Sequence, residues 1–196
     1  MKNISSKLSL VLLLFLGCSV SSCSSSDSST KPLLSLGDYT IEFDDEQYSY
    51  SNSKGVLSPG ISVIKDYLIY VVKPNKIGKK VFDNANIQIQ FTESGDTDYK
   101  PINLARFLLL LGDKKPHIGV QMSIRSPDGF AVVFYDVWEK QETAVRVEKV
   151  GDEYYIRTKE PLLLRKGKLS GMFNRDMPRE IKLSFELSTE NALKLL

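Results

Sequence analysis

The sequence predicts a mainly β protein, built as an antiparallel β-sandwich or an open barrel with room for one short helix. Roughly eight or nine segments alternate apolar and polar residues with the period of a strand. Turn residues separate these segments about every ten positions, which is typical of sandwiches and barrels. The βα alternation of a parallel α/β sheet is missing. Of the two architectures, we favour the sandwich.

The first half of the domain shows three strand signals. Residues 39–43 and 47–51 alternate around an acidic turn and predict a hairpin. Residues 61–72 (ISVIKDYLIYVV) are apolar on both parities and rich in β-branched side chains, which predicts a central strand. Residues 87–92 (IQIQFT) place their isoleucines and phenylalanine on the core side, with the glutamines outward.

One stretch departs from this pattern. Residues 101–112 (PINLARFLLLLG) are compatible with a helix that stops at Gly112 or with another buried strand. The length of the stretch and the polar loop beside it favour a short helix from Asn103 to Leu110.

The second half returns to alternation. Residues 118–124 and 130–138 flank the turn sequence RSPDG and predict a second hairpin. Residues 144–158 repeat the pattern around Gly151, and residues 181–187 (IKLSFEL) close the domain.

The first 22 residues have the composition of an export signal. Lys2 and Lys7 precede the apolar run LSLVLLLFLG (residues 8–17), and small residues follow it. A run of about ten residues is too short for a membrane-spanning helix, which needs about twenty. We therefore expect residues 1–22 to be a signal peptide and not part of the fold.

Both cysteines of the chain lie at the end of this signal. The sequence VSSC, residues 20–23, resembles the lipobox of bacterial lipoproteins, in which the cysteine is acylated after cleavage. An alternative lipobox ends at Cys18, but Phe15 fits that motif less well. A disulfide between Cys18 and Cys23 is the other alternative. The resemblance implies that Cys23 carries acyl chains such as palmitate, and Ser24 resembles the outer-membrane-sorted class.

This signal sets the domain organisation and the charge of the mature chain. Residues 23–36 are rich in serine and predict a flexible tether, and residues 37–196 form a single β-rich domain. Loss of Lys2 and Lys7 lowers the 26 basic residues to 24, which balances the 24 acidic ones. A formally neutral chain lacks the positive charge that phosphate binding needs, so nucleic acid is not an expected partner.

Catalytic and metal signals are weak. His117 is the only histidine, and it is most simply a residue at the edge of a loop that enters a strand. Asp44, Asp45, Asp96 and Asp98 are weak candidates for calcium ligands, since Ca²⁺ prefers carboxylate oxygens on loops. They are equally compatible with solvated turns. We expect no cofactor and no catalytic residues.

Aromatic residues supply the candidate ligand site. The strand 130–138 is apolar on both faces, which is typical of a buried strand. If one face is open, Phe134 and Trp138 form a flat platform for sugar rings. Tyr154 and Tyr155 point to opposite faces, so one of them is expected to be exposed, and Tyr154 is the third candidate.

The leading functional hypothesis is a non-catalytic envelope lipoprotein, anchored to the outer membrane by its lipid on the periplasmic or the external side. Its β-sandwich binds a glycan or another envelope protein. The first alternative is a carrier of lipids or small molecules with a barrel cavity. The second is a carbohydrate-active hydrolase that uses paired carboxylates. Lysine-rich runs such as residues 73–80 could contact head groups or acidic glycans, or simply protect sheet edges.

Overall fold

The structure is a computed structural model that describes residues 34, 36–43, 45–51, 53–73, 84–92, 96–125, 132–167, 177–190 and 192–195. Residues 34–196 form one compact unit, distinct from residues 1–33. All the described core side chains belong to residues 39–187, so the unit has its own hydrophobic core. The predicted signal peptide, Cys18, Cys23 and Asp44 lie outside the described residues.

The described elements are strands, apart from one short helical segment. They are β1 (Asp38–Phe43), β2 (Glu46–Tyr50), β3 (Lys54–Gly60), β4 (Tyr67–Lys73), β5 (Ala85–Phe91), β6 (Thr97–Ile102), α2 (Leu104–Phe107) with a 3-10 turn (Leu108–Leu110), β7 (His117–Arg125), β8 (Val132–Val137), β9 (Val145–Val150), β10 (Glu153–Thr158), β11 (Leu162–Lys166), β12 (Glu180–Ser188) and β13 (Leu193–Lys194). The predicted all-β class is confirmed.

All these strands belong to one mixed sheet. The main path runs β13-β3-β4-β5-β7-β6-β9-β10-β12-β1-β2. The pairs β6–β7 and β13–β3 are parallel and the other described pairs are antiparallel, so the sheet is not wholly antiparallel as predicted. A second path joins β7 to β12 through β8 and β11. It exists because β7 pairs with both β6 and β8 along one edge, and β12 pairs with both β10 and β11 along one edge.

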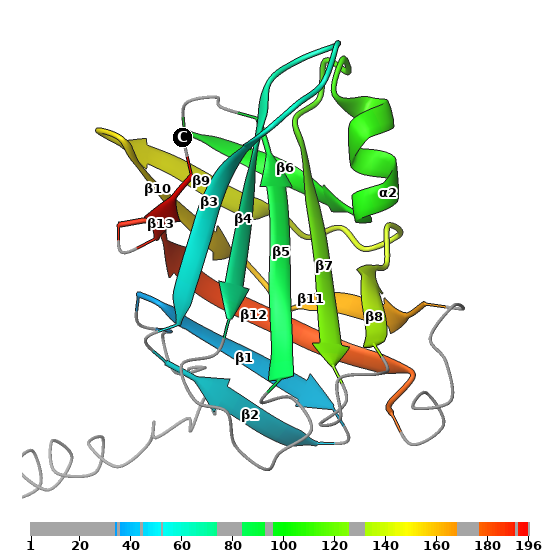
Figure 1. The fold of residues 1–196 in the computed structure, drawn as a ribbon. Coiled ribbons are helices and arrows are strands. Elements are labelled where there is room, and N and C mark those ends of the chain that lie inside the picture. The colour runs from blue at the N-terminus through cyan, green and yellow to red at the C-terminus, as the bar shows by residue number, and fades with distance from the viewer. Residues whose placement is uncertain are drawn as a thin grey trace, which may run out of the picture. The chain divides into compact units, whose positions relative to one another are not determined.

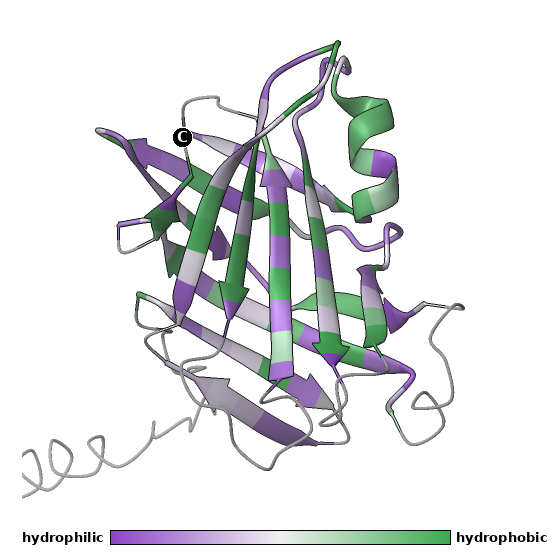
Figure 2. Ribbon diagram, in the orientation of Figure 1, coloured by the Kyte–Doolittle hydropathy of each residue, from purple (hydrophilic) through white to green (hydrophobic). Residues whose placement is uncertain are grey.

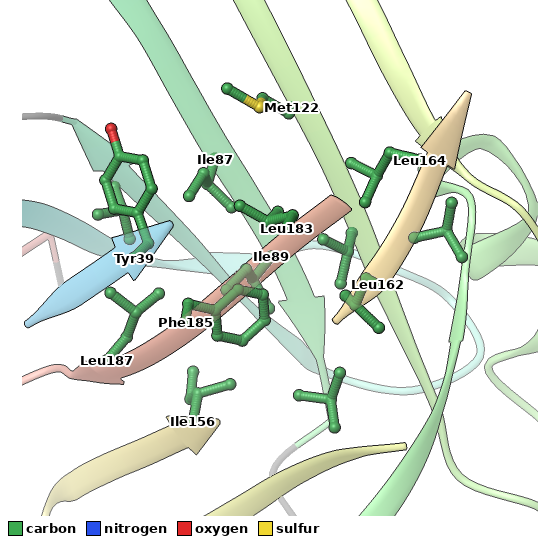
Figure 3. Packing of buried hydrophobic residues seen from close by; sticks show 14 of the residues in the cluster. Tyr39, Ile87, Ile89, Met122, Ile156, Leu162, Leu164, Leu183, Phe185 and Leu187 are labelled. Atoms are coloured by element: carbon green, nitrogen blue, oxygen red, sulfur yellow. The ribbon is translucent and has the colours of Figure 1, made fainter. Parts of the chain in front are cut away.

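The sheet bends so that its two halves face each other. In Figure 1, β3, β4, β5 and β7 lie in front of β12 and β1, which run across behind them at a steep angle, and β2 continues the rear half next to β1. Side chains from both halves form the main core. Figure 3 shows Ile87 and Ile89 of β5 and Met122 of β7 packed toward Leu183 and Phe185 of β12. This arrangement is that of a sandwich or an open barrel.

Alternation predicted the burial of most strands. On β5, Ile87, Ile89 and Phe91 are fully buried in the main core, as the sequence indicated. The predicted hairpins over residues 39–51, 118–138 and 144–158 are present as the antiparallel pairs β1–β2, β7–β8 and β9–β10. Gly151 adopts a positive φ of 63° in the β9–β10 turn, a conformation that glycine adopts readily.

The predicted strand over residues 61–72 is wrong in its first half. β4 begins only at Tyr67, and residues 61–66 form the loop that joins β3 to β4. The preceding strand β3 (KGVLSPG) escaped prediction because it contains two glycines and a proline. In the β3–β4 hairpin, the first paired residue of β4 is therefore Tyr67, six positions after the apolar run begins. The apolar side chains of residues 61–66 stay outside the sheet.

The β3–β4 hairpin packs a tyrosine over a glycine at each of its ends. A Cβ atom on Gly55 would lie 2.1 Å from Cε2 of Tyr70, and one on Gly60 would lie 2.2 Å from Cζ of Tyr67. Both rings therefore occupy the space that a side chain on the glycine would need. The Tyr70 hydroxyl donates a hydrogen bond to the carbonyl oxygen of Ser188 at 2.8 Å. Burial, with a smaller contribution from Glu153, raises the pKa of Tyr70 to about 12.

The segment 103–110 is helical, as the sequence favoured. Asn103 caps it, because its side-chain oxygen accepts a hydrogen bond from the amide of Arg106 at 2.9 Å. The helix lies in the crossover between β6 and β7, and a crossover of a dozen residues or more is what allows two sequential strands to pair in parallel. The sequence pattern did not reveal this βαβ unit, and the crossover helix explains how its two strands pair in parallel.

Candidate functional site

The helix α2 docks on the outer face of the sheet, away from the main core. Phe107 and Leu111 pack with Tyr67 and Ile102 in a second, smaller hydrophobic cluster. The rings of Tyr67 and Phe107 meet edge to face, with centroids 5.5 Å apart. Gly119 of β7 permits this contact, since a Cβ there would lie only 3.1 Å from Leu104 Cδ1 and from Phe107 Cβ.

A second contact ties the helix to the segment after β8. Arg106 forms an ion pair and a hydrogen bond with one carboxylate oxygen of Glu139. The other carboxylate oxygen accepts a hydrogen bond from the backbone amide of Asn103 at 3.4 Å. The start of the helix is therefore held from two sides. The sequence did not indicate this contact, because the two partners lie 33 positions apart.

A pocket of about 230 Å³ lies where α2 and the loop after it meet the sheet. Its buried lining is apolar on the helix side, with Phe107 and Leu111, and carries Thr92 on the sheet side. Thr97 and His117 border it from the first residues of β6 and β7. The pocket therefore combines an aromatic ring with hydroxyl and imidazole groups, which suits a ligand with both apolar and polar faces.

The exposed part of the lining is cationic. Lys65, Lys114 and Lys115 border the pocket, and Asp113 is the acidic residue among the lining residues. None of the three lysines is ion-paired or hydrogen-bonded through its side chain to another described residue. Three unpaired cations beside one carboxylate favour a negatively charged ligand.

His117 offers a further polar group to this pocket. Its side chain is half-buried, and its Nδ1 atom is buried without a hydrogen-bond partner among the described residues. Most buried polar atoms in proteins are hydrogen-bonded, so a buried nitrogen without a partner is an exception. It is the residue His117, and not this atom alone, that lines the cavity. The sequence placed His117 correctly at the start of a strand, but its position at a pocket depends on the fold.

The three predicted ligand-binding aromatics do not form one surface. Tyr154 is 4% exposed and packs edge to face against Phe91 in the main core, at 5.2 Å between centroids, so it is the buried member of the pair Tyr154 and Tyr155 and offers no open surface to a ligand. Phe134 is 38% exposed on the outer face of β8. Trp138 follows that strand, but the guanidinium of Arg165 lies 4.4 Å from its ring centroid and covers it.

The acidic candidates have cationic neighbours. Asp96 and Asp98 lie beside Arg146, and Asp98 also pairs with Lys159. The hydrogen bond from Lys159 is the main cause that lowers the pKa of Asp98. Asp45 occupies a turn with a positive φ of 62°. Among the residues that the structure describes, no group of three His, Cys, Asp or Glu side chains could hold a metal ion.

The interior between the two layers is filled by side chains. Most members of the main core have no exposed surface, including residues from β1, β5, β7 and β12. The pocket beside α2 lies outside this core. No helix in the described ranges has the length and apolarity that crossing a membrane requires.

Fold and pocket define a class of protein: a mainly β domain whose described strands form a curved mixed sheet, with a βαβ crossover and a cationic pocket beside the helix of that crossover. Comparisons with protein-family models, with curated proteins and with solved structures gave no match.

Proposed function

We propose that this chain is a lipid-anchored envelope lipoprotein whose β domain binds the acidic end of a glycan, without catalysis, in the pocket beside α2. The observation that carries the proposal is the grouping of Lys65, Lys114 and Lys115 with His117 around one cavity. The three ammonium groups supply positive charge and N–H donors for a carboxylate or phosphate on a sugar.

The size and lining of the pocket support a sugar over other occupants. About 230 Å³ is smaller than the roughly 300–1,000 Å³ of sites for drug-sized ligands, so the occupant is a group of about one sugar ring. Phe107 offers an aromatic surface, and Thr92 and Thr97 offer hydroxyl groups. A lipid carrier would need an apolar cavity between the layers, where the described core is packed, so we do not favour that alternative.

The anchor has its own test. The intact mass of the native protein should match a chain that begins at an acylated Cys23, because residues 1–22 form the signal. Replacing Cys23→Ala should release the protein from the membrane fraction, whereas Cys18→Ala should leave it anchored. A native mass that retains residues 1–22 and shows no acyl group on Cys23 or Cys18 contradicts the anchor.

Charge reversal at the pocket tests the ligand class. The Lys114→Glu/Lys115→Glu variant of residues 24–196 should lose acidic-glycan binding by about tenfold or more, since two favourable charges become repulsive. A glycan array of uronate-bearing, phosphate-bearing and neutral sugars measures this. The variant Lys54→Glu/Lys73→Glu is the matched control, because these exposed lysines face each other at the far ends of β3 and β4.

Three results separate the alternatives. Selective binding of acidic glycans that the control retains supports the proposal. Binding that the Lys114→Glu/Lys115→Glu variant also retains places the ligand elsewhere and overturns the pocket assignment. An empty glycan array together with specific capture of one purified envelope protein favours the protein-partner hypothesis instead.

A further inference from the structure

The loop between β3 and β4 exposes its apolar side chains. Ile61 is 96% exposed and Val63 is fully exposed, although their residue types are usually buried. Ile64 is also exposed. Figure 2 shows the apolar colour at the tip of this loop, which projects beyond the end of the sheet. We call residues 61–64 the apolar tip.

The helical segment extends this surface. Leu109 is 77% exposed, and Leu108 beside it is also exposed. The turn that follows this segment is adjacent to the apolar tip, because a Cβ on Gly112 would lie 3.5 Å from Cγ2 of Ile64. Exposed apolar side chains that gather at one end of a domain are typical of a surface that docks on a partner or a membrane.

Charged residues border the apolar tip. Lys65, Lys114 and Lys115 are exposed here, together with Asp66 and Asp113. Positive charge is in excess, which favours an anionic surface. Lysine side chains also have long apolar stems, so they can follow inserted residues while their ammonium groups stay with head-group phosphates.

The shape of the tip indicates a bilayer. Ile61 and Val63 project from the end of a loop, where they make little contact with the rest of the domain. A protein partner would need a matching cavity for each side chain, whereas the interfacial region of a bilayer accepts apolar side chains without one.

The length of the chain before the domain allows this contact in an anchored protein. The amide of Ser53 donates a hydrogen bond to Gly37 O at 3.1 Å, which places the start of the domain beside the start of β3. The tip follows the opposite end of this seven-residue strand, about 23 Å away. The stretch from Cys23 to Gly37 spans at most about 50 Å when extended, so the tip can reach the bilayer that holds the anchor.

We propose that the apolar tip inserts into an anionic lipid bilayer, with Ile61 and Val63 among the acyl chains and the lysines at the head-group phosphates. Anchoring by Cys23, which belongs to the proposed function, would make this contact intramolecular and add to the intrinsic affinity of the tip. The contact orients the domain and holds the opening of the pocket near the membrane surface. This inference goes beyond glycan binding and does not depend on it.

Vesicle flotation of residues 24–196, which lack the lipid, tests the proposal. The protein should float with vesicles of phosphatidylethanolamine and phosphatidylglycerol. Its binding to vesicles of phosphatidylcholine alone should be weaker by a factor of about five or more. The variant Ile61→Ser/Val63→Ser should reduce binding to the anionic vesicles by roughly tenfold or more. Val150→Ser is the matched control, because Val150 is 62% exposed beside the β9–β10 turn.

The Ile61→Ser/Val63→Ser variant should have the melting temperature of the wild type, since the replaced side chains are exposed. It should also retain any acidic-glycan binding. These two measurements separate failure of the membrane-insertion proposal from failure of the glycan-binding proposal. The proposal is overturned if the wild type does not float with anionic vesicles or if the Ile61→Ser/Val63→Ser variant floats equally well. It is also overturned if sedimentation velocity shows a dimer that the variant loses, because the tip would then bind a second copy of the chain.

Discussion

Replacing Gly55→Ala should destabilise the β domain by about 3 kcal/mol, the upper part of the range for overpacked cores. The added methyl group would lie 2.1 Å from Cε2 of the Tyr70 ring, and it cannot move away because its position is fixed by the backbone. Tyr70 is buried and hydrogen-bonded to Ser188 through its hydroxyl, so moving the ring breaks this bond and disturbs the contact between the two halves of the sheet. Urea denaturation measures the loss.

Two controls isolate the steric cause. Gly151→Ala places a side chain at a positive φ of 63° with nothing within 4 Å, so it should cost only about 1 kcal/mol from backbone strain. In the double variant Gly55→Ala/Tyr70→Leu, the two effects should be less than additive, because the smaller side chain leaves room for the methyl group. Wild-type stability for Gly55→Ala would show that the Tyr70 ring does not cover Gly55.

Replacing Phe107→Ala should unfold the helical segment and abolish the proposed glycan binding. The Phe107 side chain is buried, contacts Tyr67 edge to face and lines the pocket. Loss of a buried phenylalanine costs about 3–5 kcal/mol. Because the cluster around α2 is separate from the main core, we expect the damage to remain local.

Hydrogen exchange separates local from global unfolding. Amides of residues 104–111 should exchange much faster in the Phe107→Ala variant, while those of β5 and β12 stay protected. Leu108→Ala on the same segment is the control, since this exposed side chain should cost only a few tenths of a kcal/mol. Undiminished glycan binding by Phe107→Ala would remove the pocket from consideration as the site.

Prediction from sequence succeeded where burial follows local alternation. The residues Ile87, Ile89 and Phe91 are buried because successive side chains of a strand point to opposite faces, whatever its partners are. The helix from Asn103 was predictable in part because its N-cap is a local hydrogen bond. The predicted strand over residues 61–66 was wrong, because an apolar run does not show whether a neighbouring strand is present to pair with it.

The sequence alone determined the β class, most hairpin positions and the inward faces of the strands, because these depend on side-chain period and turn chemistry within a few residues. Tertiary structure decided the pocket, the burial of Tyr154, the cover that Arg165 provides for Trp138, and the exposure of the apolar tip. Thr92, His117 and Lys65 come together only because the order and curvature of the sheet bring the ends of distant strands to one place. Long-range strand pairing is set by the packing of the whole domain, and no local pattern encodes it.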